Sequence, residues 1–103
     1  MGINVVWKDE RGHSLGEIED AGMLLSRFAA RHACRMTSSI CLQFLDPAGD
    51  ACFNQGQIPH LVNELVAAKE SIDDPKLVAH LDQIIVLAER AREVHTYLWF
   101  VGD

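Results

Sequence analysis

The sequence predicts an α+β fold: a mostly antiparallel sheet of about four to five strands, with about three helices packed on it. Two observations lead to this prediction. Segments in which apolar and polar residues alternate lie near both ends of the chain and in its middle, as in half-buried strands. Segments with apolar residues three and four positions apart lie between them, as in amphipathic helices. The predicted order is β-β-α-β-β-α-α-β, within a single domain that spans residues 1–103.

The first two predicted strands form a hairpin. Ile3, Val5 and Trp7 alternate with residues of the other face, a pattern that indicates a strand. A polar turn that ends at Gly12 follows, and residues 13–19 return as the second strand.

A change to helical spacing marks the next element. Asp20 is a good N-cap residue, and we expect a helix over residues 21–33. Arg27, Arg31 and Arg35 form a basic stripe on this helix. We interpret the stripe as a solvated face, and contact with phosphate is the alternative.

A second hairpin is predicted over residues 37–53. Ile40, Leu42 and Phe44 alternate with their neighbours and indicate its first strand. The sequence Asp-Pro-Ala-Gly-Asp at residues 46–50 is a strong turn signal, and a short return strand follows it.

Two amphipathic helices come next, joined by a short turn. Pro59 lies in the first turn of a helix that extends to about Lys69. Asp74 as N-cap and Pro75 at the first helical position begin a second helix, which extends to about Val94. The short joint predicts an antiparallel pair.

The last predicted strand is apolar on both sides. Tyr97, Trp99 and Val101 face one way, and Leu98 and Phe100 face the other. A strand of this kind is expected inside a sheet, between other strands. Burial of Leu98 and Phe100 under the helices would stabilise the fold by roughly 1.5 to 3 kcal/mol each.

The sheet face that carries Tyr97 and Trp99 has no predicted helix left to cover it. We expect polar neighbours there, such as Asn4, Lys8 and Gln43. An exposed aromatic patch with a polar rim is typical of a binding surface.

Composition narrows the class of protein. The chain has 15 acidic and 9 basic residues and a net charge of −6 with neutral histidines. This balance disfavours nucleic acid and an anionic membrane surface as partners. We find no transmembrane run and no secretion signal, and therefore expect a cytoplasmic protein. Cys34, Cys41 and Cys52 lack the Cys-x-x-Cys spacing and fit a reducing compartment.

No catalytic signature occurs in the sequence. The five histidines form none of the usual metal-binding spacings, and the glycines do not form a phosphate-binding loop. Cys34 is the best candidate for a nucleophile, but its expected place near a helix C-terminus has the wrong dipole sign to stabilise a thiolate. We predict that the protein is not an enzyme and uses no metal or other cofactor.

Two segments carry a resemblance to known proteins: DPAGDACFNQGQIPHLVNEL and HTYLWFVGD. Their layout is similar to a group of small bacterial proteins with a turn, a strand that ends in Phe-Asn, a helix like Pro-x-Leu-x-x-Glu-Leu, and an ending like Tyr-Leu-x-Phe-x-Gly-Asp. Small acidic chains of this sort resemble the immunity proteins of toxin–immunity pairs, including those of contact-dependent growth inhibition. The resemblance implies a cytoplasmic protein that binds and neutralises a cognate toxin, often a nuclease.

The leading hypothesis is therefore a toxin inhibitor that acts by occlusion. A nuclease carries positive charge to hold its substrate, and an acidic inhibitor can imitate the phosphates and speed the encounter. We expect Tyr97 and Trp99 to be aromatic anchors, and Glu17, Glu19 and Asp20 to supply negative charge.

Two alternatives remain. The chain could be a non-enzymatic homodimer, a structural or housekeeping module whose uncovered sheet faces pack together. A small-molecule binder or enzyme with a pocket between sheet and helices is the third hypothesis, and it requires converging polar groups and a perturbed titration. Trp7 and Trp99 are each compatible with a core position or with the surface patch.

Overall fold

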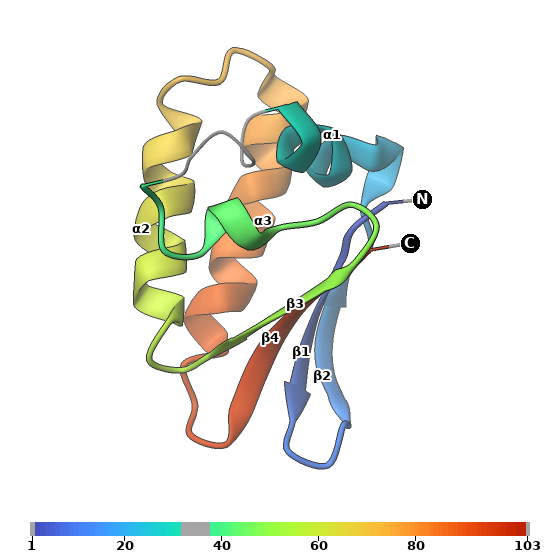
Figure 1. The fold of residues 1–103 in the computed structure, drawn as a ribbon, viewed down its shortest axis with the longest axis vertical. Helices are drawn as coiled ribbons and strands as arrows, with labels where there is room; N and C mark the ends of the chain where they lie inside the picture. The colour runs from blue at the N-terminus through green and yellow to red at the C-terminus, as the bar shows by residue number, and fades with distance from the viewer. Residues whose placement is uncertain (1, 32–37, 103) are drawn as a thin grey trace.

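The computed structural model describes residues 2–31 and 38–102 and confirms the predicted α+β fold. Figure 1 shows a sheet with the helices on one side of it. The described elements are β1 (Asn4–Asp9), β2 (Ser14–Ile18), α1 (Leu24–Arg31), β3 (Asp50–Asn54), α2 (Ile58–Lys69), α3 (Pro75–Arg90) and β4 (Thr96–Val101), with short 3-10 helices at Ala21–Met23 and Leu42–Phe44.

The four strands form one antiparallel sheet in the order β2-β1-β4-β3. The last strand therefore lies between two others, as its two apolar sides predict. Its register is set on both flanks: Val101 is opposite Asn4 of β1 and Asp50 of β3. Gly102 extends this pairing, because its N–H donates to the carbonyl of Gly49 at 2.9 Å.

The core lies between the sheet and the helices. Leu98 and Phe100 of β4 are 0% and 1% exposed, and the Phe100 ring meets Phe53 edge to face at a centroid distance of 5.6 Å. Val5 and Trp7 belong to the same buried cluster, so the face of β1 that carries Ile3, Val5 and Trp7 packs toward the helices. The burial of Leu98 and Phe100 between the sheet and the helices docks the last strand.

The predicted strand at residues 40–45 is wrong. Leu42–Phe44 form a 3-10 helix, and Cys41 and Leu42 are both buried although they are neighbours. The physical reason is Glu64 of α2, whose carboxylate accepts from three successive backbone N–H groups, those of Ile40 at 2.6 Å, Cys41 at 3.1 Å and Leu42 at 2.9 Å. A strand would need these donors for a neighbouring strand.

The other parts of that segment agree with the prediction. The turn closes with a hydrogen bond from Gly49 N–H to the Asp46 carbonyl at 3.2 Å, and β3 is the short return strand. Thr37, where the predicted hairpin begins, lies outside the described residues.

The helices follow their sequence signals with shifts at the ends. The helix predicted over residues 21–33 begins as a 3-10 turn in which Gly22 has φ of 66°, and residues 32 and 33 lie outside the described part. Asp74 caps α3 by accepting from the Lys76 N–H at 2.9 Å. This helix ends at Arg90, short of the predicted Val94, because the chain needs residues 91–95 to turn into β4.

Candidate functional site

The sheet face opposite the helices is the best candidate for a functional surface. We call it the open sheet face, and its members follow from the strand register: Asn4, Val6, Lys8, Ser14, Glu17, Asp50, Cys52, Asn54, Tyr97, Trp99 and Val101. One row crosses all four strands as Glu17, Val6, Trp99 and Cys52. The helices pack against the other side (Figure 1).

The centre of the open sheet face is aromatic. Tyr97 and Trp99 are half-buried, and the Lys8 ammonium lies 5.4 Å from the centroid of a Trp99 ring, in cation–π contact. Val6 is only 7% exposed although it faces away from the helices, so its neighbours on this face cover it. Part of each aromatic side chain is therefore already packed, and the rest is exposed.

Both edges of the open sheet face carry exposed acids. Glu17 lies on edge strand β2, and Asp50 lies on edge strand β3. Glu19 is also exposed, one residue beyond the end of β2. The structure thus brings Tyr97, Trp99 and Glu17 together on one face, with Glu19 beside its edge.

Asp20 requires a correction, because it is not a surface charge. Its side chain is fully buried, and its carboxylate accepts from the backbone N–H groups of Ile3 at 2.9 Å, Leu25 at 2.7 Å and Ser26 at 2.9 Å. His80 Nε2 of α3 lies 3.3 Å from its Oδ1 atom, without hydrogen-bond geometry. Asp20 therefore caps α1 from the interior and ties it to the start of β1.

The sequence left open where the tryptophans lie, and the structure separates them. Trp7 is 6% exposed and belongs to the core, with the guanidinium of Arg90 at 5.3 Å from its ring centroid. Trp99 lies on the open sheet face. Gln43 is not on this face: it belongs to the 3-10 helix, where its backbone N–H donates to Ser39 Oγ at 2.9 Å.

The two described cysteines are poor nucleophiles. Burial raises the pKa of the Cys41 thiol to about 11, and the nearby Glu64 charge adds to the effect. Partial burial also raises the pKa of the Cys52 thiol, although the nearby positive charge of Lys8 reduces this increase. Both thiols therefore stay protonated near neutral pH. Cys34, the nucleophile candidate from the sequence, lies outside the described residues.

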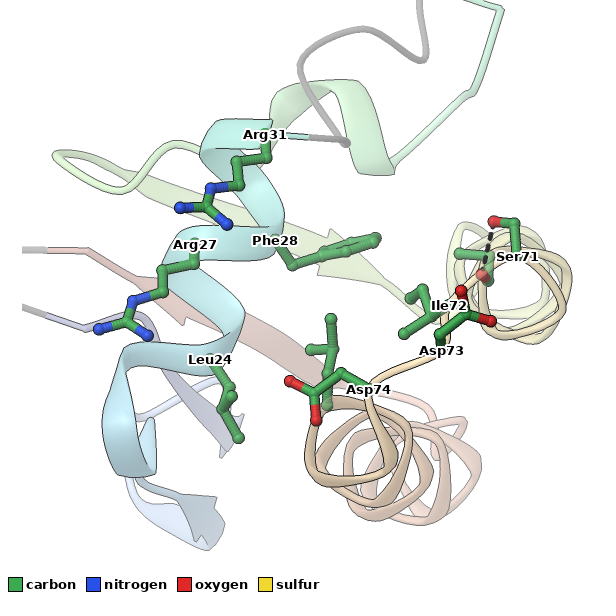
Figure 2. A pocket seen from close by; sticks show the side chains of 10 residues that line it. Leu24, Arg27, Phe28, Arg31, Ser71, Ile72, Asp73 and Asp74 are labelled. Atoms are coloured by element: carbon green, nitrogen blue, oxygen red, sulfur yellow. Dashed lines mark hydrogen bonds between the residues drawn. The ribbon is translucent and has the colours of Figure 1, made fainter.

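Two hollows accompany these features. A shallow one of about 380 Å³ lies at the end of the sheet and adjoins the open sheet face at Asn54 and Tyr97, with His95 and Gly56 in its lining. A larger pocket of about 530 Å³ lies in the helix layer, between α1 and the turn that joins α2 to α3 (Figure 2). No sequence pattern signalled either hollow, because each combines residues from distant segments.

The described residues contain no group of three or more His, Cys, Asp or Glu side chains that could hold a metal ion. None of the helices in this part of the chain is long and apolar enough to cross a membrane. Compared with known proteins, the chain matches no family model, no curated protein and no solved structure.

Proposed function

We propose that this chain is a binding protein, and not an enzyme, that neutralises a cognate bacterial toxin in the cytoplasm by covering it with the open sheet face. The observation that carries the proposal is the pairing of a partly exposed aromatic centre, Tyr97 and Trp99, with exposed acids on both sheet edges. A patch of this composition favours protein association.

Charge supports a basic partner such as a nuclease. The chain carries 15 acidic against 9 basic residues, and Glu17, Glu19 and Asp50 place part of this excess around the aromatic centre. Opposite charge on the partner would speed the encounter and orient it. The resemblance to immunity proteins points to the same kind of partner.

The anchors are expected to dominate the affinity. Aromatic residues at the centre of an interface are typical hot spots, and loss of one costs about 2 kcal/mol or more, which is about 30-fold in Kd. The hollow beside Tyr97 offers a place for a side chain of the partner.

The experiment uses the whole chain as bait for proteins of its source cell, followed by expression of each captured protein alone and together with the chain. We expect a basic partner that stops growth when expressed alone and is neutralised by the wild-type chain. Glu17→Lys with Asp50→Lys should weaken this partner's binding at least tenfold and reduce protection. Both sites are exposed, so the fold should survive the change.

Tyr97→Ala and Trp99→Ala test the anchors. The matched control is Val86→Ala, at a position that is 63% exposed on α3, away from the open sheet face. Wild-type binding by a folded Tyr97→Ala, Trp99→Ala double variant would rule out this surface. A chain that captures only itself, and has twice the monomer mass, would favour the homodimer instead.

A further inference from the structure

The pocket in the helix layer is a second candidate site, distinct from the open sheet face. Its apolar lining comes from α1, α2, the turn between α2 and α3, and the start of α3: Leu24, Phe28, Ala68, Ile72 and Leu77. Figure 2 shows Leu24 and Phe28 pointing from α1 toward Ile72 and the turn. The volume of about 530 Å³ lies within the range of small-molecule sites.

Two arginines of α1 lie beside this pocket, and Figure 2 shows their side chains directed away from its apolar space. Arg27 and Arg31 are exposed and one helical turn apart, and both belong to its lining. Like charges at this spacing repel each other on a helix. Neither guanidinium forms an ion pair with a residue that the structure describes, and the sequence of residues 32–37 contains no Asp or Glu.

This local positive charge is opposite in sign to the net charge of the chain, which has 15 acidic and 9 basic residues. Two adjacent arginines without an ion-pair partner among the described residues are therefore not part of a generally basic surface. Guanidinium groups bind carboxylates in a planar, two-bonded geometry, which makes a carboxylate a fitting counterion.

The opposite wall limits which anions fit. Asp73 and Asp74 line the pocket from the turn, and Figure 2 shows them on the far side of the apolar space from both arginines. The Asp74 carboxylate already accepts from the Lys76 N–H. A ligand with several negative charges would meet this acidic wall, whereas a ligand with one carboxylate can keep it at the α1 rim.

We propose that this pocket binds a small amphipathic monocarboxylate. Its apolar body would lie between Phe28 and Ile72, and its carboxylate would meet Arg27 and Arg31 at the rim after these exposed side chains rotate toward it. The site goes beyond toxin binding and uses none of the residues of the open sheet face.

The test is a titration of the full chain with octanoate, followed by NMR and calorimetry. We expect saturable binding with shifts of the Leu24, Ile72 and Leu77 methyl signals. Octylamine and inorganic phosphate should bind at least tenfold more weakly, because one lacks the anion and the other lacks the apolar body.

Arg27→Gln with Arg31→Gln should weaken octanoate binding at least tenfold and leave octanol binding unchanged. The matched control is Arg11→Gln, an exposed arginine in the turn between β1 and β2. Absence of saturable octanoate binding would overturn the proposal. Equal binding of octylamine or of phosphate, or full octanoate affinity in the double variant, would overturn it as well. None of these outcomes depends on a toxin partner.

Discussion

Substitution of Asp20 separates a structural role from a binding role. The buried carboxylate holds two parts of the fold, since its Oδ2 atom accepts from Ile3 and Ser26 and its Oδ1 atom accepts from Leu25. Asn keeps the shape and one acceptor oxygen, whereas Ala removes both. The two variants therefore remove different numbers of hydrogen bonds at one site.

The decrease in the free energy of unfolding depends on how many N–H donors lose their acceptor. If the Asn oxygen takes the place of Oδ2, only the Leu25 N–H is left facing an amide group, and one buried unsatisfied donor costs about 1 to 3 kcal/mol. Asp20→Ala leaves three such donors. Water entry and relaxation make the losses less than additive, so we expect a decrease of about 3 to 5 kcal/mol in the free energy of unfolding.

Urea unfolding followed by circular dichroism measures both variants. Asp73→Asn, at an exposed aspartate, is the control and should change stability by less than about 0.5 kcal/mol. A decrease for Asp20→Ala no larger than that of the control would refute the role of the buried carboxylate. Folded Asp20→Asn should keep wild-type affinity for the partner, because the side chain does not reach the surface.

Three further predictions concern the end of β4 and the thiols. Gly102→Ala should destabilise the fold by about 1 to 3 kcal/mol, because its Cβ would lie 2.6 Å from the carbonyl oxygens of Asp46, Pro47 and Gly49. Unfolding experiments check this against Gly56→Ala, where only a side-chain oxygen comes near, at 3.3 Å, and equal losses would contradict it. In a Cys34→Ser background, the raised pKa values predict that Cys52 and Cys41 react with a thiol reagent at pH 8 more slowly than free cysteine, with Cys41 the slower. The pKa of the Cys41 thiol is about 11 in the folded chain, against 9.0 for a free thiol. The protonated Cys41 thiol therefore makes its full contribution to stability below pH 9, and this contribution is lost as the pH rises toward 11. The difference in the free energy of unfolding between the wild-type chain and Cys41→Ala should become smaller over that pH range. A constant difference would contradict the assignment.

The parts of the fold that the sequence predicts well are those with local signals. Asp74 followed by Pro75 marks the start of α3, and the structure shows the cap in place. The period-two pattern of β4 predicts its two faces, and with them the placement of Tyr97 and Trp99 away from the helices. Such signals need only a few neighbouring residues.

The parts that the sequence mispredicts depend on distant partners. Residues 40–42 do not form a strand because the carboxylate of Glu64, more than twenty positions away, accepts hydrogen bonds from their N–H groups. Asp20 has the signal of a helix cap, which is correct in kind, but its burial comes from Ile3 and from α3. No local pattern carries either contact.

The candidate site was predictable only along single strands. The residue pattern of β4 alone predicts Tyr97 and Trp99 as site residues, and the segment that forms β2 alone predicts Glu17. Cys52 and Asp50 join them through the pairing of β3 with β4, and this register could not be read from the chain. The pocket beside Arg27 could not be predicted from the sequence, because its lining residues come together only when the helices pack.

The contact between Lys8 and Trp99 defines the arrangement that the proposed partner would have to match. One side of the Trp99 ring is already taken by an ammonium group, so a second cation at the centre would meet the Lys8 charge. The negative charge available to a partner lies instead at the edges, on Glu17 and Asp50. A complementary partner would therefore place apolar side chains over Tyr97 and Trp99 and basic side chains to either side. Because Val6 is already covered and the aromatic side chains are half-buried, little ordering of the centre is left for binding to impose, which favours affinity.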